Sequence, residues 1–241
     1  MLQMHVDWPV NTMHTEHPKI IEILDFWLAD ADQSAAAAKA QGKRWFGGGE
    51  TIDQEIRQRF GAWVEKAESG ELDDWQLTAR GALAFIILLD QFTRNVYRNS
   101  SRAFASDDRT LALSLAVQHD DRFEQLGCMA RGFVLMPMQH SEDLTVQNDS
   151  VEAFRLQVQR APEGYREILE GSLEYAILHR DIIERFRRFP HRNPILGRPH
   201  TDEEAAWLAD GAPTFGQDGL FTFVNTGTFI QVLASKFQRS V

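Results

Sequence analysis

The stretch ALAFIILL, Ala82 to Leu89, decides the fold of this chain because every one of its residues is apolar. It is far shorter than the roughly 18 to 20 residues that cross a membrane. A helix that is apolar on every face is buried all round, so we expect this one at the centre of the protein. The polar block LLDQFTRNVYRN, Leu88 to Asn99, follows directly. The central helix therefore leads into a group of charged and amide side chains.

Apolar residues recur with helical spacing on both sides of this stretch. One stripe runs from Ile20 to Leu28, a longer one from Ile52 to Ala67, and a late one from Tyr165 to Phe186. Gly70 is a plausible stop for the second of these helices. Short polar residues predict where helices begin. The predicted starts are a capping box of Thr51 with Gln54, an N-cap at Asp73 or Asp74, N-caps at Ser106 and Ser141, and a capping box of Thr201 with Glu204.

These patterns predict an all-α protein of about nine or ten helices with short loops. The best strand signal is Leu220 to Val224. No linker rich in Pro, Gly or Ser divides the chain, so we expect one helical domain over residues 17–211. Residues 1–16 are expected to form an N-terminal extension, and residues 212–241 a C-terminal extension of uncertain structure.

Composition narrows the classes of protein. The net charge of −10 and pI of about 5.3 argue against a general nucleic-acid binder, which normally shows a basic face. The single cysteine, Cys128, excludes an internal disulfide and fits a reducing compartment. The first residues show no secretory signal and no apolar run reaches membrane-spanning length, so we expect a cytoplasmic protein without a membrane partner.

Three blocks place charged and amide side chains directly beside apolar ones: the block after the central stretch, LMPMQHSEDLTVQ (135–147) and RFPHRNPILGR (188–198). Polar groups beside a core must be hydrogen-bonded or paired, or they cost several kcal/mol. The three blocks therefore predict one shared polar centre.

In the first block, residues three and four apart are neighbours on a helix. Asp90 and Arg94 can pair, while Gln91, Asn95 and Arg98 form a second polar row. One interpretation is a donor-rich surface for a carboxylate or phosphate. The other is an internal clamp that ties the central helix to its neighbours.

In the second block, Pro137 should kink or end a helix just before His140. If the stretch stays helical, His140, Asp143 and Gln147 share a face and could supply a base, an orienting carboxylate and an amide donor. The alternative is a hydrogen-bonded histidine at a helix junction, with Glu142 and Asp143 in the first turn of the next helix.

A metal site is a further alternative in the second block. His140 with Glu142 or Asp143, and with His179 or His191, are metal-ligand types. No HExxH or comparable spacing supports such a site, so we predict no metal and no cofactor.

In the third block, Pro190 and Pro194 bracket His191, Arg192 and Asn193. Proline stiffens such a segment, and stiffened loops often present side chains to a site. The alternative is a structural corner whose arginines cap helix C-termini.

At these blocks the sequence resembles the bacterial family called domain of unknown function 924. The resemblance rests on LLDQFTRNVYR, FASD (104–107), MPMQHSEDL and RFPHRNPILGR followed by TDEE, in order over residues 17 to about 210. The chain departs from the family pattern at Thr93, where the family usually has proline, and at Gln139. The resemblance implies stacked antiparallel helix pairs, as in tetratricopeptide-like superhelices, with a concave face. It implies no activity.

Two functions follow as hypotheses. The first is a binding module that holds a small anionic molecule or an acidic peptide end in a polar groove. The second is a hydrolase-like acid/base enzyme in which a carboxylate orients His140 and Arg94 or Arg192 stabilises negative charge. The candidate catalytic residues are His140, Asp143 and Glu142, and the candidate ligand-binding residues are Asp90, Gln91, Arg94, Asn95, Arg98, Gln147, His191, Arg192 and Asn193.

Overall fold

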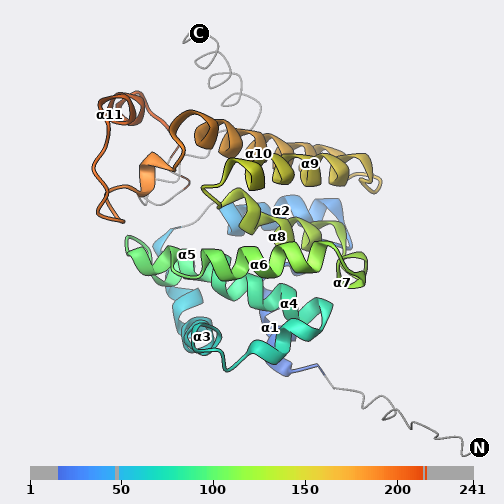
Figure 1. Ribbon diagram of the computed structural model, residues 1–241. Coiled ribbons are helices and arrows are strands. Elements are labelled where there is room, and N and C mark those ends of the chain that lie inside the picture. Colours follow the sequence, from blue (N-terminus) through green and yellow to red (C-terminus); the bar gives the residue numbers. More distant parts are fainter. Residues whose placement is uncertain (1–15, 47–48, 214, 216–241) are drawn as a thin grey trace, which may run out of the picture.

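The computed structural model describes residues 16–46, 49–213 and 215, and this part of the chain is helical with no strand (Figure 1). The prediction of one all-α domain is therefore confirmed. The predicted strand at Leu220 to Val224 lies outside the described residues. The division into a core and two terminal extensions, 1–16 and 212–241, stays a prediction.

The α-helices are connected by short loops and single helical turns. They are α1 (Pro18–Trp27), α2 (Ala35–Phe46), α3 (Glu50–Ser69), α4 (Ala79–Ile86), α5 (Thr93–Val96), α6 (Asp107–Gln118), α7 (Asp121–Glu124), α8 (Cys128–Gln139), α9 (Leu144–Gln159), α10 (Arg166–Phe186) and α11 (Asp202–Ala209). Short 3-10 helices are η1 (Asp73–Leu77), η3 (Ser101–Phe104) and η4 (Pro190–Arg192), and a π-helical segment is η2 (Ile87–Phe92).

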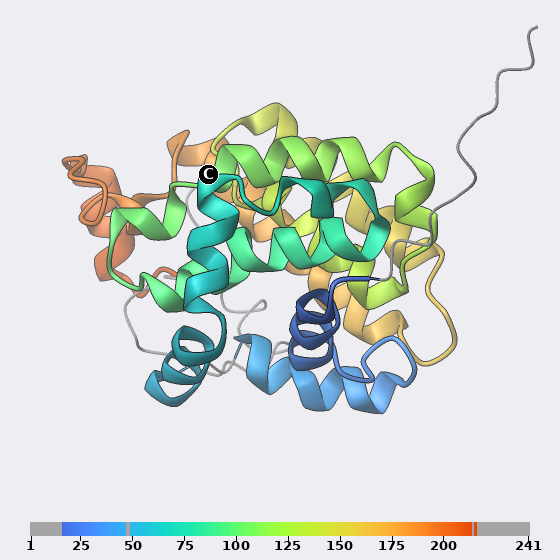
Figure 2. The same ribbon diagram turned by 90° about the horizontal axis from the view of Figure 1, so that it is seen from below.

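Helix α4 lies at the centre, as its apolar sequence predicts. Every residue from Ala82 to Leu89 is at most 1% exposed. The helix packs against α1, α6 and α8, and Figure 2 shows α1 and α2 along one side of the molecule with α6 along the other. Helices α9 and α10 lie side by side and form the layer at the top of Figure 1.

The central helix changes its winding where the polar block begins. It runs from α4 into the π-helical η2 and then into α5. Thr93 is buried, and its Oγ1 donates to the carbonyl of Leu89 at 2.8 Å. A π turn holds an extra residue, which turns the following side chains relative to the α-helix, and such turns are frequent at functional sites. Asp90 lies within this segment and is fully buried.

The predicted limits of α3 are half right. The helix ends where Gly70 adopts a left-handed conformation, with φ 89°, and this stop is confirmed. It begins at Glu50 with Gly49 as its N-cap, so the predicted capping box of Thr51 with Gln54 is wrong.

Of the other predicted helix starts, some are confirmed and some are wrong. Thr201 and Glu204 form the predicted capping box of α11. Ser106 is the N-cap of α6, but its side chain makes no capping bond. Helix α4 is capped by Thr78, whose side chain accepts from the N–H of Gly81, because the predicted capping aspartates form the first turn of η1 instead.

Helix α8 is held at its first turn by a distant carboxylate. Asp32, in the α1–α2 connection, accepts from the N–H groups of Met129 at 2.6 Å and Ala130 at 3.2 Å. A Cβ added at Gly127 would lie 2.2 Å from the Asp32 carboxyl carbon. A side chain at position 127 therefore has to displace the group that caps α8.

Two glycine substitutions in and beside α8 separate this contact from helix propensity. We expect Gly127→Ala to lower the free energy of unfolding by about 2 kcal/mol, because it breaks the capping bonds from Asp32. We expect Gly132→Ala to raise it by roughly 0.5 kcal/mol, since no atom lies within 4 Å of the added Cβ and alanine favours helix. Urea unfolding measures both, and equal effects would contradict the role of Asp32.

Candidate functional site

The second and third polar blocks line a pocket of about 300 Å³, which we call the His140 pocket. The first block does not line it, but Asp90 bonds His140 and Arg94 bonds Asp107. Its walls come from η3 and the start of α6, from the end of α8 and the loop after it, and from the loop that contains η4. It is lined by Ser101, Phe104, Ala105, Asp107, Asp108, Leu111, Pro137, His140, Ser141, Glu142, Arg192 and Leu196.

A histidine and a buried aspartate from two different blocks form a pair beside this pocket. His140 is the C-cap residue of α8, and its Nδ1 lies 2.7 Å from Oδ1 of the fully buried Asp90. The amide of Gln91 donates to the other oxygen of Asp90 at 2.6 Å. The Nε2 atom of His140 has no hydrogen-bond partner among the described residues, and the ring lines the pocket. One ring nitrogen is therefore held by a carboxylate while the other remains for a ligand.

The Asp90 carboxylate is ionised in this setting. Burial by itself raises the pKa of Asp90, but the neighbouring His140 and Arg94 charges and the hydrogen bonds from His140 and Gln91 outweigh it, so the pKa lies below its ordinary value. An ionised carboxylate can only accept, so His140 carries its proton on Nδ1. This fixes the orientation and the tautomer of the imidazole, as orienting carboxylates do at catalytic histidines.

Arg94 connects Asp90 to the next acid, Asp107. Its Nη2 lies 2.6 Å from Oδ1 of Asp107 and 3.8 Å from Oδ1 of Asp90, and its Nη1 donates to the carbonyl of Ala103. The guanidinium carbon lies 4.7 Å from the ring centroid of Phe104. The predicted Asp90–Arg94 pair is present, but Arg94 lies closer to Asp107 than to Asp90.

Arg192 is the arginine that faces the pocket. Its residue is 7% exposed, and its guanidinium carbon lies 4.7 Å from the ring centroid of Phe104 and 4.5 Å from that of Phe189. Among the described residues its one hydrogen bond runs from Nη1 to Oδ2 of Asp107 at 3.3 Å, and Nε has no partner. Burial and the nearby Arg94 lower its pKa to about 10, so the side chain stays charged at neutral pH.

Glu142 ties the third block to the second. Its carboxylate accepts from Arg198 Nη1 at 2.7 Å, from Arg198 Nη2 at 3.0 Å, and from the N–H of Phe189 at 2.8 Å. Burial raises the pKa of Glu142, but these donors outweigh it and hold the pKa below its usual range. Glu142 lines the pocket with both oxygens already bonded.

The start of α6 also faces the pocket. Asp107 and Asp108 line it, and the N-cap Ser106 does not bond the first backbone N–H groups of the helix. No described residue accepts from the N–H groups of Asp107, Asp108 or Arg109. A helix start with free N–H groups favours negative charge.

Asp143 and Gln147 are placed elsewhere. Helix α8 ends at Gln139, so the continuous helical face of His140, Asp143 and Gln147 does not form. Asp143, not Ser141, is the N-cap of α9 and accepts from two N–H groups of its first turn. The buried amide of Gln147 donates to the carbonyls of Gln139 and Ser141 at 2.7 Å each, which clasps the loop between α8 and α9.

Asn95 and Arg98 of the second polar row do not line the pocket, whereas Gln91 of the same row bonds Asp90. Asn95 donates to Asp53 at 2.8 Å, and Arg98 bonds both oxygens of the same carboxylate at 2.5 and 2.7 Å. Asp53 belongs to α3 and is buried. These residues join α5 to α3, and the structure does not bring them to His140.

His191 and Asn193 support the loop rather than line the pocket. Asn193 is fully buried, donates to Glu204 at 3.2 Å and accepts from Arg198 at 2.9 Å. The His191 ring lies 5.5 Å from Phe189, and burial together with the neighbouring Arg192 holds its pKa well below the ordinary value.

The chain is similar to a known protein family and to a solved structure. A family model described as a bacterial protein of unknown function (DUF924) matches residues 23–212. The chain belongs to this family. A solved structure of a protein of unknown function from Agrobacterium tumefaciens is similar, with a TM-score of 0.64 and 31% identity over 80% of this chain and 98% of that one. No curated protein matches the chain. The predicted family is thus confirmed, and both the family and the similar structure are described as of unknown function.

Sequence reasoning missed two acids of this DUF924 chain. Asp107 lies in the FASD motif, which supported the resemblance but was not assigned to the site. Asp53 lies one helical turn before Ile56 and two before Phe60, on the buried face of α3. An acid in phase with an apolar stripe is a signal for a buried partner, and that signal was available.

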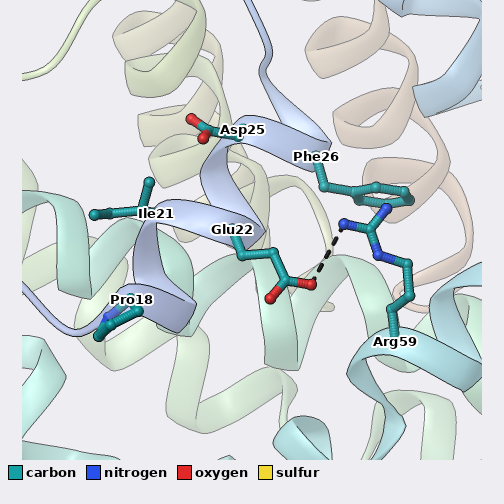
Figure 3. Close-up of a pocket in the computed structure, with 6 residues that line it drawn as sticks. All are labelled: Pro18, Ile21, Glu22, Asp25, Phe26 and Arg59. Carbon is teal, nitrogen blue, oxygen red and sulfur yellow. Dashed lines mark hydrogen bonds and ion pairs between the residues drawn. The ribbon is translucent and has the colours of Figure 1, made fainter.

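A second hollow, of about 490 Å³, lies on the surface of α1 and α3, and no residue of the three blocks lines it (Figure 3). Arg59 covers the ring of Phe26 at 4.6 Å and bonds Glu22 at 3.3 Å. Because Arg59 is already paired with Glu22, this hollow is the weaker candidate for a functional site. Among the described residues, no group of three or more metal-ligand side chains could hold a metal ion, and no described helix is long and apolar enough to span a membrane.

Replacing Asp90 tests whether the buried pair supports the fold. We expect Asp90→Asn to lower the free energy of unfolding at pH 7 by about 3 kcal/mol, because a buried charge pair is broken. The pKa of Asp90 is lowered by folding, so its stabilisation is present above about pH 4 and is lost as pH falls through the folded-state pKa. The difference between variant and wild type should therefore shrink below pH 4.

Urea unfolding at pH 7, 5 and 3.5 measures this effect. Asp108→Asn is the matched control, because Asp108 is exposed at the rim of the same pocket and has no bonded partner in the described structure; its effect should stay within about 0.5 kcal/mol. An Asp90→Asn variant as stable as the control would show that the pair does not hold the centre together.

Proposed function

We propose that the His140 pocket binds a small anionic molecule or the anionic end of a peptide. The observation that carries this proposal is Arg192. A guanidinium has five N–H donors, and the only hydrogen bond of this buried one within the described structure is the contact with Asp107. Unused donors in a buried position favour a ligand that brings acceptors.

The acids around the pocket support the same conclusion. Asp107 uses one oxygen for Arg94 and the other for Arg192, and both oxygens of Asp90 and of Glu142 are bonded as well. Apart from the exposed Asp108 at the rim, these acids have no spare oxygen, while Arg192 and the start of α6 offer spare donors. A ligand rich in acceptors complements this balance, and an amine or other pure donor does not.

The proposal also concerns the fold around this pocket and the compartment in which the protein works. Neighbouring helices α8, α9 and α10 pack in sequence, which is compatible with the tetratricopeptide-like stacking that the family resemblance implies (Figure 1). We also propose that the protein works in the cytoplasm, since one cysteine fits a reducing compartment. The negative net charge makes nucleic acid and anionic membranes poor partners.

Anion binding through Arg192 predicts a specific loss. Isothermal titration of the wild type with acetate, citrate, phosphate and sulfate should find at least one that binds, and Arg192→Lys should weaken it by at least ten-fold, because lysine lacks the planar fork. Arg185→Lys is the control, since Arg185 is exposed and pairs with Glu203 away from the pocket. Unchanged affinity in a folded Arg192→Lys variant would contradict the proposal.

A second candidate function is an acid/base enzyme, and the Asp90–His140 pair favours it. Asp90, rather than Asp143 or Glu142, is the carboxylate that orients His140. Nε2 would then take a proton from a water or ligand in the pocket, and Arg192 would stabilise the negative charge that develops. Within the described structure no hydroxyl or thiol is bonded to Nε2, so water would be the nucleophile in a hydrolysis.

Two replacements of His140 test this candidate. An asparagine keeps a donor close to the Nδ1 position for Asp90 but lacks Nε2, so His140→Asn should fold normally and lose at least 100-fold in hydrolytic rate. The probe is p-nitrophenyl acetate, with release of nitrophenolate followed by absorbance. His140→Ala should lose both rate and stability. Wild-type rates in the folded His140→Asn variant would rule out His140 as the base.

A further inference from the structure

We propose that the preferred ligand of the His140 pocket is a small hydroxy-monocarboxylate, bound by its carboxylate at Arg192 and by its hydroxyl at His140. This inference rests on the proposed anion site and narrows its chemistry. It depends on the shape of the donor edge, on the charges around the pocket, and on the ring nitrogen that remains for the ligand.

The donor edge of Arg192 is planar and lies beside two aromatic rings. The guanidinium carbon lies 4.7 Å from the ring centroid of Phe104 and 4.5 Å from that of Phe189, and neither ring offers a hydrogen-bond donor. A carboxylate matches such an edge with two oxygens in one plane. A phosphate or sulfate can also place two oxygens on this edge, but its further oxygens gain no donor from these rings.

The charges around the pocket disfavour more than one negative charge on the ligand. The groups concerned are the carboxylates of Asp90, Asp107, Asp108 and Glu142 and the guanidiniums of Arg94, Arg192 and Arg198. With neutral His140 these groups sum to one negative charge, and with imidazolium they are neutral. Repulsion grows in proportion to ligand charge, so a dianion is disfavoured relative to a monoanion.

The hydroxyl follows from His140. Asp90 holds Nδ1, so Nε2 is the ring nitrogen left for the ligand, as an acceptor in the neutral ring and as a donor in the imidazolium. A hydroxyl can donate to the first form and accept from the second, whereas a carbonyl can only accept. A ligand hydroxyl therefore suits both forms of the ring. The volume of about 300 Å³ lies at the low end for ligand pockets and limits the molecule to a small one.

Matched pairs of probes test the inference on the full chain. Isothermal titration compares lactate with propionate, 3-hydroxybutyrate with butyrate, and all four with inorganic phosphate. We expect at least one hydroxy acid to bind roughly five-fold more tightly than its deoxy partner, the gain from about one hydrogen bond. Phosphate should bind more weakly than any of the carboxylates that bind.

Variants assign each half of the ligand. His140→Asn should remove the difference within a pair and leave the deoxy acid unaffected, while Arg192→Lys should weaken both members equally; circular dichroism checks that each variant folds. A tightest affinity for phosphate, or equal affinity within both pairs, would overturn this inference and leave the anion site standing. If none of these five probes binds, the inference is overturned. If citrate and sulfate also fail to bind, the proposed function is overturned as well.

Discussion

The structure depends on one buried charge, the carboxylate of Asp90 in the most apolar helix of the protein. A lone ionised carboxylate in such a place costs far more than any single contact returns. This cost is offset by His140 at the end of α8 and by Gln91 and Arg94, which follow Asp90 along the central helix. The bond between Asp90 and His140 joins the end of α8 to the central helix, and the pocket lies at this end of α8.

From Asp90 the charges continue in alternation across the molecule. Arg94 connects it to Asp107 at the start of α6, and Asp107 connects to Arg192 in the loop after α10. Glu142 and Arg198 fasten the same loop to the end of α8. Segments that are distant in sequence thereby form one wall. Arg94 pairs with two acids, as the clamp interpretation of the first block describes. The donor role is the one proposed for Arg192 in the third block.

Much of the fold could be predicted from the sequence, because helical periodicity and burial act over a few neighbouring residues. Helix starts were less predictable, since several nearby polar residues can cap and packing selects one, as Thr78 shows. A partner for His140 was sought in its own block, on the condition that the stretch stays helical past Pro137. The true partner, Asp90, lies fifty residues earlier, and only the packing of α8 on η2 brings the two together.

The alternating chain of charges has a consequence for how this family can vary. Replacing one member leaves its neighbour with an uncompensated charge, so the effects of changes along the chain are not additive. A second change at the adjacent position can restore balance where the first alone is harmful. We therefore expect linked changes at these positions in related proteins. An alignment would show replacements together or not at all at Asp90, Arg94, Asp107 and Arg192.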